Sequence, residues 1–214
     1  MRDDLRAVDI DRQPVSTRRL EAFSDGVFAI AATILVLDLT AGAIGEVDTD
    51  AEFLRNLLAT VPEMLNFALS FLLLGLLWMI HVRQFEHVVA VDTTLLWLNV
   101  LRLLGVVFVP FATTLNNEYS EFIGGRMILP VTFLWVIVFG TVQWQYATAA
   151  NRNLVRGLSP VAVHDSRVAA VSALVTGILV GALSALIGSF AFLLFALDPV
   201  VRLVLRRMGV LRLP

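Results

Sequence analysis

Few side chains in this sequence could take part in ion or proton chemistry, and two of them stand in a triplet at the start of an apolar segment. Phe23, Ser24 and Asp25 place a hydroxyl and an ionisable carboxylate directly before an apolar run that continues to Leu37. A charge that enters a hydrocarbon-crossing helix is costly, so it normally faces a polar partner or a water-filled path. The triplet therefore predicts either a polar contact between helices or part of an ion pathway.

Three further polar residues, Trp78, His81 and Asn99, stand within or beside apolar stretches. If their helices are antiparallel neighbours of the one that carries Ser24 and Asp25, all five residues lie at a similar depth near the cytoplasmic end. Polar groups buried in a membrane must find partners. We therefore expect a shared hydrogen-bond network that braces the first helix.

Arg102 is a separate case. It lies about 15 Å along a helix that begins near Asp92, at about 1.5 Å per residue, which is roughly mid-membrane. An unpaired arginine at that depth is costly, so its guanidinium should reach an anion or a hydrated cavity. Asp25 is the candidate anion.

An apolar stripe follows the polar triplet. Ile30, Ile34 and Leu37 are spaced i, i+4, i+7 and so share one face of a helix, with Thr33 beside them. Such a stripe packs against neighbouring helices or lines a path, and the spacing alone leaves both interpretations open. Asp38 ends the stripe on the outer side, where its carboxylate would raise the local cation concentration at a pore mouth.

The composition indicates whether the helices that position these residues lie in water or in a lipid bilayer. Apolar residues make up 58% of the chain, charged residues 16%, and the mean hydropathy is +0.82, which is typical of a membrane protein. Nucleotide-binding and metalloprotease motifs and paired catalytic carboxylates are missing from the sequence. We expect no enzyme activity, no cofactor, no fixed metal site and, at a net charge of −2, no nucleic-acid partner.

The apolar runs predict an all-α, polytopic membrane protein that forms a single domain over residues 1–214. The last run is too long for one span and is expected to fold back near Ser184 to Gly188. We expect six transmembrane helices, with five as the alternative count. Their predicted ranges are 18–44, 62–87, 92–115, 126–149, 167–184 and 188–207.

The arginines predict the orientation. All 16 basic residues are arginine, and with six spans only Arg55 and Arg126 fall outside, while Arg102 lies within a helix. This asymmetry favours an N-in, C-in topology under the positive-inside rule. The first twenty residues are polar and lack an apolar signal region, so we expect no removable signal peptide.

Three segments resemble the bacterial branch of the transmembrane protein 175 family of potassium channels. They are the Arg-x-x-x-Phe-Ser-Asp pattern from Arg19, Leu77 to Phe85, and Leu95 to Asn99. The resemblance adds Arg19 to the bracing network. It implies a homotetramer in which the first helix of each subunit lines the pore, the narrowest ring being Ile30.

The same resemblance makes Ile34 and Leu37 further pore layers and connects Thr33 with potassium preference, so that potassium ions pass transiently near Thr33. It implies a potassium-permeable, leak-type channel surrounded by lipids in the bacterial inner membrane. The alternative is a secondary transporter or a proton pathway that uses Asp25, His81 and Arg102. A non-conducting membrane scaffold is a third interpretation. On the fourth helix, Val136 is expected to face lipid.

Overall fold

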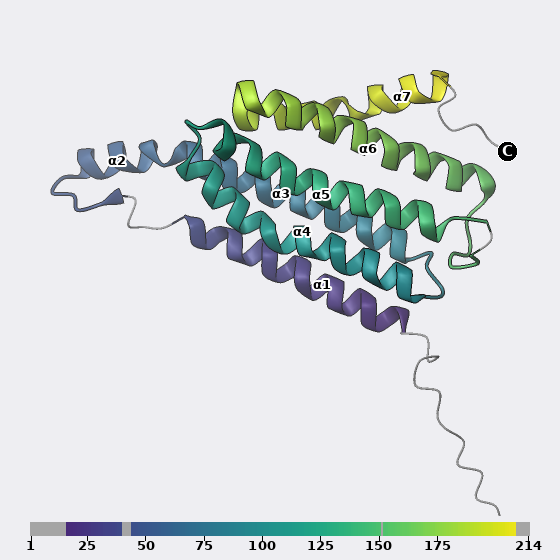
Figure 1. Cartoon of the computed structure of the whole chain (residues 1–214). Coiled ribbons are helices and arrows are strands. Elements are labelled where there is room, and N and C mark those ends of the chain that lie inside the picture. The colour runs from purple at the N-terminus through teal and green to yellow at the C-terminus, as the bar shows by residue number, and fades with distance from the viewer. Residues whose placement is uncertain (1–15, 40–43, 151, 209–214) are drawn as a thin grey trace, which may run out of the picture.

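A computed structural model describes residues 16–39, 44–150 and 152–208, and long helices run side by side through them (Figure 1). In chain order the elements are α1 (Thr17–Ile34), η2 (Leu35–Asp38), α2 (Asp50–Ala59), α3 (Val61–Phe85), α4 (Thr93–Glu118), α5 (Ile123–Ala147), α6 (Pro160–Ile187), η4 (Gly188–Leu197) and α7 (Asp198–Met208). The predicted all-α class is confirmed.

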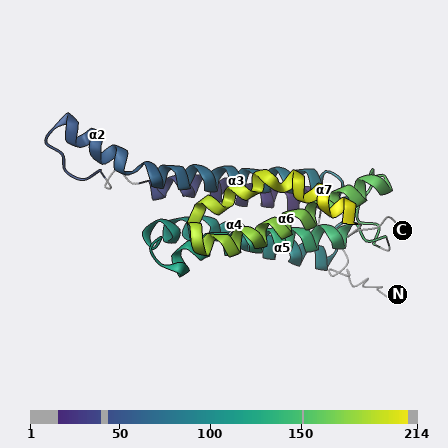
Figure 2. The same cartoon turned by 90° about the horizontal axis from the view of Figure 1, so that it is seen from above.

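Five segments are long and apolar enough to cross a membrane, and the fifth covers residues 160–205. That segment is folded back on itself, because η4 and α7 return along α6 (Figures 1 and 2). The reversal occurs at Gly188, whose φ of +60° favours glycine. The described part of the chain therefore passes along the bundle six times, and its two ends lie at the same end of the bundle (Figure 1).

Local sequence signals set several helix ends. Asp92 caps α4 by accepting a hydrogen bond from the backbone N–H of Leu95, and Ser159 caps α6 at Ala162 in the same way. Because Pro160 fits the first turn after that cap, α6 begins earlier than the predicted residue 167. The regular α-helix of α1 ends at Ile34 and tightens into one 3₁₀ turn, whereas the predicted range ran to residue 44.

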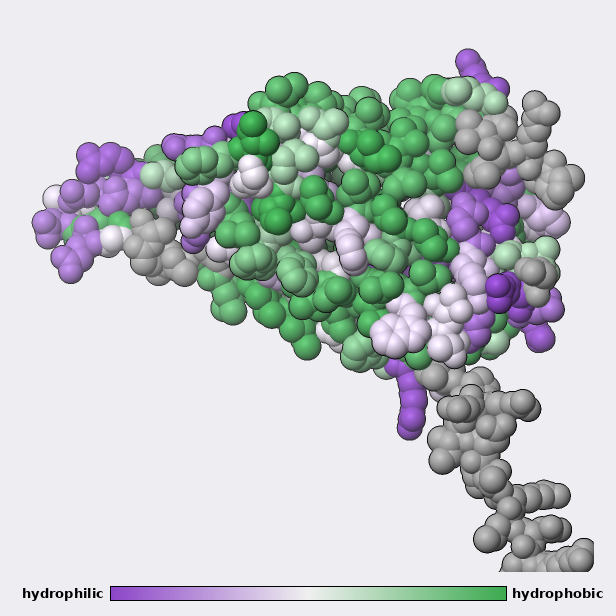
Figure 3. Space-filling model, viewed as in Figure 1, coloured by the Kyte–Doolittle hydropathy of each residue, from purple (hydrophilic) through white to green (hydrophobic). Residues whose placement is uncertain are grey.

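The surface has the profile of a membrane protein. Figure 3 shows a broad hydrophobic band between hydrophilic ends, one of which is the α2 region. Inside, one apolar cluster joins all the long helices through residues such as Phe28, Leu74, Val106 and Phe133. Val136 belongs to this core and is fully buried, so the expectation that it faces lipid is wrong. The reason is that α5 is apolar on all sides, so its sequence does not show which side of the helix faces the core.

Candidate ion pathway and its polar supports

One face of α1 packs into the subunit and the opposite face is bare. Its buried side chains recur along the face that contacts α3 and α4. On the other face, Ile30 is 61% exposed, Ile34 43% and Leu37 69%, and Thr33 is exposed beside them. Four residues predicted to line a path therefore share a face that none of the described residues covers.

The Thr33 hydroxyl donates a hydrogen bond to the carbonyl oxygen of Ile30 at 2.9 Å. Because its proton is used within the helix, the hydroxyl oxygen keeps its lone pairs for another donor or for a cation. Asp38, the predicted mouth residue, ends η2, and its side chain lies outside the described part of the structure.

A buried chain of hydrogen bonds joins α1 to three other helices. Ser24 donates to the carbonyl of Leu20 in its own helix at 2.8 Å and accepts from Asn99 Nδ2 at 3.0 Å. Gln143 Nε2 donates to Asn99 Oδ1 at 3.1 Å. Arg102 Nη1 then donates to Gln143 Oε1 at 3.2 Å and to Gln84 Oε1 at 3.0 Å. We call this set the amide chain, and it links α1, α4, α5 and α3.

The other predicted network members lie outside the amide chain. Trp78 Nε1 donates to Asp25 Oδ1 at 2.9 Å, which ties α1 to α3. His81 is buried beside the rings of Phe28 and Phe85, at centroid distances of 5.6 and 4.3 Å.

Neither ring nitrogen of His81 has a hydrogen-bond partner among the described residues. Arg19 is exposed in the first turn of α1 and makes no side-chain hydrogen bond or ion pair with them. The six predicted residues therefore do not form one network: Ser24 bonds to Asn99 and Asp25 to Trp78, while the other two make no side-chain hydrogen bond with the described residues.

Sequence reasoning missed Gln84 and Gln143. Both lie near the ends of apolar helices, and glutamine at such positions also suits the membrane interface, so the sequence carries only a weak signal for them. Asp25 does not partner Arg102, because Asp25 faces Trp78 while the guanidinium reaches the two glutamines. The candidate metal-ligand side chains in the described ranges form no group of three or more.

The chain is similar to known proteins in sequence and fold. The sequence profile of a family described as "Endosomal/lysosomal potassium channel TMEM175" matches residues 19–110. A protein of Chamaesiphon minutus, named a potassium channel, is 38% identical over 141 residues, which is 64% of this chain and 69% of that protein. The chain belongs to the TMEM175 family.

Other TMEM175 relatives match over smaller parts of their length. A Streptomyces collinus protein, also named a potassium channel, is 41% identical over 101 residues, which cover 47% of this chain and 48% of the relative. The Danio rerio protein named "Endosomal/lysosomal proton channel TMEM175" is 38% identical over 141 residues, or 63% of this chain and 27% of its own.

The fold agrees with this family. A crystal structure of a lysosomal potassium-selective channel TMEM175 homolog from Chamaesiphon minutus superposes with a TM-score of 0.66 at 28% identity, covering 90% of this chain and 97% of that one. A second crystal structure, of a TMEM175 potassium channel variant bound to a nanobody fusion, gives 0.60 at 18% identity, covers 94% and 95%, and supports the fold alone. TMEM175 is a family of ion channels and not of enzymes.

Proposed function

We propose that this chain is one subunit of a potassium-permeable, leak-type channel, a homotetramer of the bacterial inner membrane in which α1 of each subunit faces the common axis. The observation that carries the proposal is the bare face of α1, which presents Ile30, Thr33, Ile34 and Leu37. A single bundle of this size packs its own core, so a pore requires one helix from each of several copies. The potassium-channel names of the bacterial relatives support the choice of ion.

The chemistry of this face suits a hydrophobic constriction. A ring of Ile30 side chains offers no oxygen ligands, so a cation that passes must give up part of its hydration without replacement. Potassium holds its water less tightly than sodium and crosses such a ring more easily. The free lone pairs of the Thr33 hydroxyl, directly beside the ring, supply partial ligands to the passing ion.

The rest of α1 suits a pore wall that is anchored in the subunit. Its opposite face is fastened by Ser24 in the amide chain and by Asp25 to Trp78. The α-helix is continuous from Thr17 to Ile34, whereas substrate-binding helices of many secondary transporters are interrupted near mid-membrane. These features favour a channel over a transporter.

Substitution of Ile30 tests the proposal in liposomes or planar bilayers. Ile30→Asn adds an amide at the level of the constriction, so unitary conductance should rise and the preference of potassium over sodium should fall. Ile178→Asn is the matched control, because Ile178 is 53% exposed on α6, and it should leave both quantities unchanged. An Ile30→Asn channel that assembles correctly and conducts as the wild type does would remove α1 from the pore.

Proton permeation along the same path is a second candidate, favoured by the proton-channel name of the vertebrate relatives. A relay through Asp25, His81 and Arg102 has little support, because the three side chains have different partners and the His81 ring nitrogens have none in the described residues. Reversal potentials measured with a pH gradient at equal potassium on both sides distinguish the candidates. A shift toward the proton equilibrium potential would favour proton permeation.

A further inference from the structure

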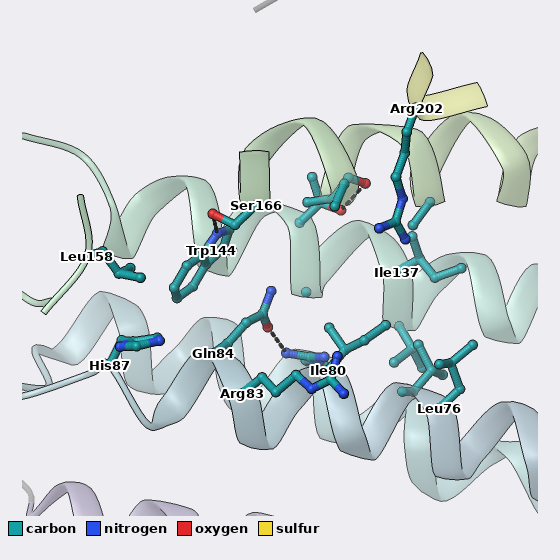
Figure 4. A pocket seen from close by; sticks show the side chains of 18 residues that line it. Leu76, Ile80, Arg83, Gln84, His87, Ile137, Trp144, Leu158, Ser166 and Arg202 are labelled. Atoms are coloured by element: carbon teal, nitrogen blue, oxygen red, sulfur yellow. Dashed lines mark hydrogen bonds between the residues drawn. The ribbon is translucent and has the colours of Figure 1, made fainter. Parts of the chain in front are cut away.

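A cleft of about 400 Å³ opens between α3 on one side and α5, α6 and α7 on the other. Figure 4 shows it from close by: Arg83 and Gln84 come from α3, while Arg202 extends toward the cleft from α7 on the opposite side. We call this space the α3–α6 cleft. It lies away from the bare face of α1, so the proposed pore does not use it.

Arg102 forms part of the wall of this cleft and is only 2% exposed. Its two side-chain hydrogen bonds go to the neutral amides of Gln84 and Gln143, and its Nε has no partner among the described residues. No carboxylate of the described residues forms an ion pair with it. A buried guanidinium without an anion is costly in a membrane protein. A negatively charged ligand at this site would therefore be stabilising.

The guanidinium lies nearer the end of the bundle than its Cα does. Gln84 stands in the last turn of α3, which ends at Phe85, and Gln143 lies about one turn before the end of α5. The Arg102 side chain therefore runs from mid-membrane toward the interface. Its charged group reaches the level at which lipid phosphates can approach.

Two further cations line the cleft. Arg83 is exposed and has no ion-pair or hydrogen-bond partner among the described side chains, and Arg202 pairs with Asp198. Asp198 is the one carboxylate that lines either the cleft or the cavity beside it, within the described residues. The lining of the cleft and the adjoining cavity thus carries three guanidinium groups and one carboxylate, so its net charge is positive.

An apolar cavity of about 380 Å³ adjoins the cleft and shares part of its lining with it. Leu73 from α3, Phe133 from α5 and Phe195 from η4 contribute side chains that the cleft itself does not use. A cationic space that continues into an apolar one fits an amphiphile with an anionic head. A soluble anion would leave the apolar part without an occupant.

We propose that the α3–α6 cleft binds an anionic phospholipid, with the phosphate between Arg83, Arg102 and Arg202 and an acyl chain in the adjoining cavity. Basic pockets between transmembrane helices recognise such headgroups. The lipid phosphate supplies the anion that Arg102 lacks. Because Arg102 belongs to the amide chain, the bound lipid also connects to Ser24 on α1 through Gln143 and Asn99. The binding does not depend on whether the protein conducts ions.

Native mass spectrometry of the full chain in detergent tests this with dioleoyl phosphatidylglycerol and dioleoyl phosphatidylcholine. Wild-type protein should retain phosphatidylglycerol preferentially. Arg83→Gln should weaken its apparent affinity about fivefold, which corresponds to about 1 kcal/mol per basic residue near a lipid surface. Arg83 is exposed and unpaired within the described residues, so this variant should fold normally. Arg207→Gln removes an exposed arginine from α7 outside the cleft and should leave the affinity unchanged.

Several results would overturn the proposal. Equal retention of the two lipids would mean that the charges do not select a headgroup, and equal losses in both variants would indicate diffuse attraction. Thermal stability measured with phosphatidylglycerol and with inorganic phosphate separates two kinds of ligand. If phosphate alone raised the melting temperature as much as the lipid does, the cleft would be a site for free anions. The chain has no cysteine, so Leu76→Cys places a single thiol at the cleft. Disulfide-linked dimers of that variant would show that a second copy covers the cleft.

Discussion

Asn99→Leu is the sharpest test of the amide chain. Asn99 is fully buried, donates to Ser24 Oγ at 3.0 Å and accepts from Gln143 Nε2 at 3.1 Å. Leucine has the same number and branching of side-chain heavy atoms as asparagine, so it removes the hydrogen bonds while still filling the site, although its two methyl groups are bulkier than the amide. A buried Gln143 N–H left without an acceptor costs about 1–3 kcal/mol, and the lost Ser24 contact adds roughly 0.6 kcal/mol. We expect the free energy of unfolding to fall by about 1.6–3.6 kcal/mol.

The assay is reversible unfolding in mixed micelles, followed by circular dichroism as the denaturing detergent increases. A double-mutant cycle with Ser24→Ala isolates the contact between α1 and α4, and its coupling energy should be about 0.6 kcal/mol, at most about 1.7. A coupling energy of zero, or an Asn99→Leu protein as stable as the wild type, would show that the amide chain does not hold α1 in place.

Three further changes have definite expected outcomes. Gly105→Ala should destabilise the α4–α5 interface by about 1–3 kcal/mol, because its Cβ would lie 2.5 Å from Trp135 Cδ1, while Gly75→Ala, with open space around it, should be neutral in the same unfolding assay. Arg102→Gln should lower thermal stability and leave unitary conductance nearly unchanged; a large change in single-channel current would place Arg102 on the permeation path. Asp25→Ala should reduce the yield of assembled protein in size-exclusion chromatography more than it changes ion preference, since Trp78 Nε1 loses its acceptor; a normal yield with altered selectivity would contradict this.

The number of passes could be predicted because hydrocarbon thickness fixes the length of an apolar run. The reversal at Gly188 was predictable for a related reason, since the apolar run that includes the predicted ranges 167–184 and 188–207 is too long for one crossing and a glycine stands near its middle. The stripe of Ile30, Ile34 and Leu37 could be recognised in the sequence because the polar residues of α1 indicate which side of the helix faces its neighbours. Its place on the exposed face agrees with a role in a pore, and that role stays a prediction.

The rotation of the other helices could not be predicted. In α5, apolar residues surround the helix, so Val136 looked equivalent to its lipid-facing neighbours, yet it lies against Gly105 in the core. The partners of Arg102 depend on the same rotations, which bring Gln84 and Gln143 to one point from residues far apart in the chain. His81 was expected to bond because it is polar, but the structure places it beside two phenylalanine rings, where shape and not hydrogen bonding determines its position.

The contacts of α1 are unevenly distributed along its length. Its side-chain hydrogen bonds to other helices are made by Ser24 and Asp25 in the lower half, while Phe28, Ala31 and Leu35 hold the upper half through apolar packing. Hydrogen bonds are directional and break when a helix slides, whereas apolar contacts tolerate small displacements. The polar contacts therefore fix the position of α1 near Ser24, about midway along the helix. In the proposed channel, a given tilt about Ser24 would displace Leu37 more than Ile30, so the width of the outer opening would change more than that of the Ile30 ring.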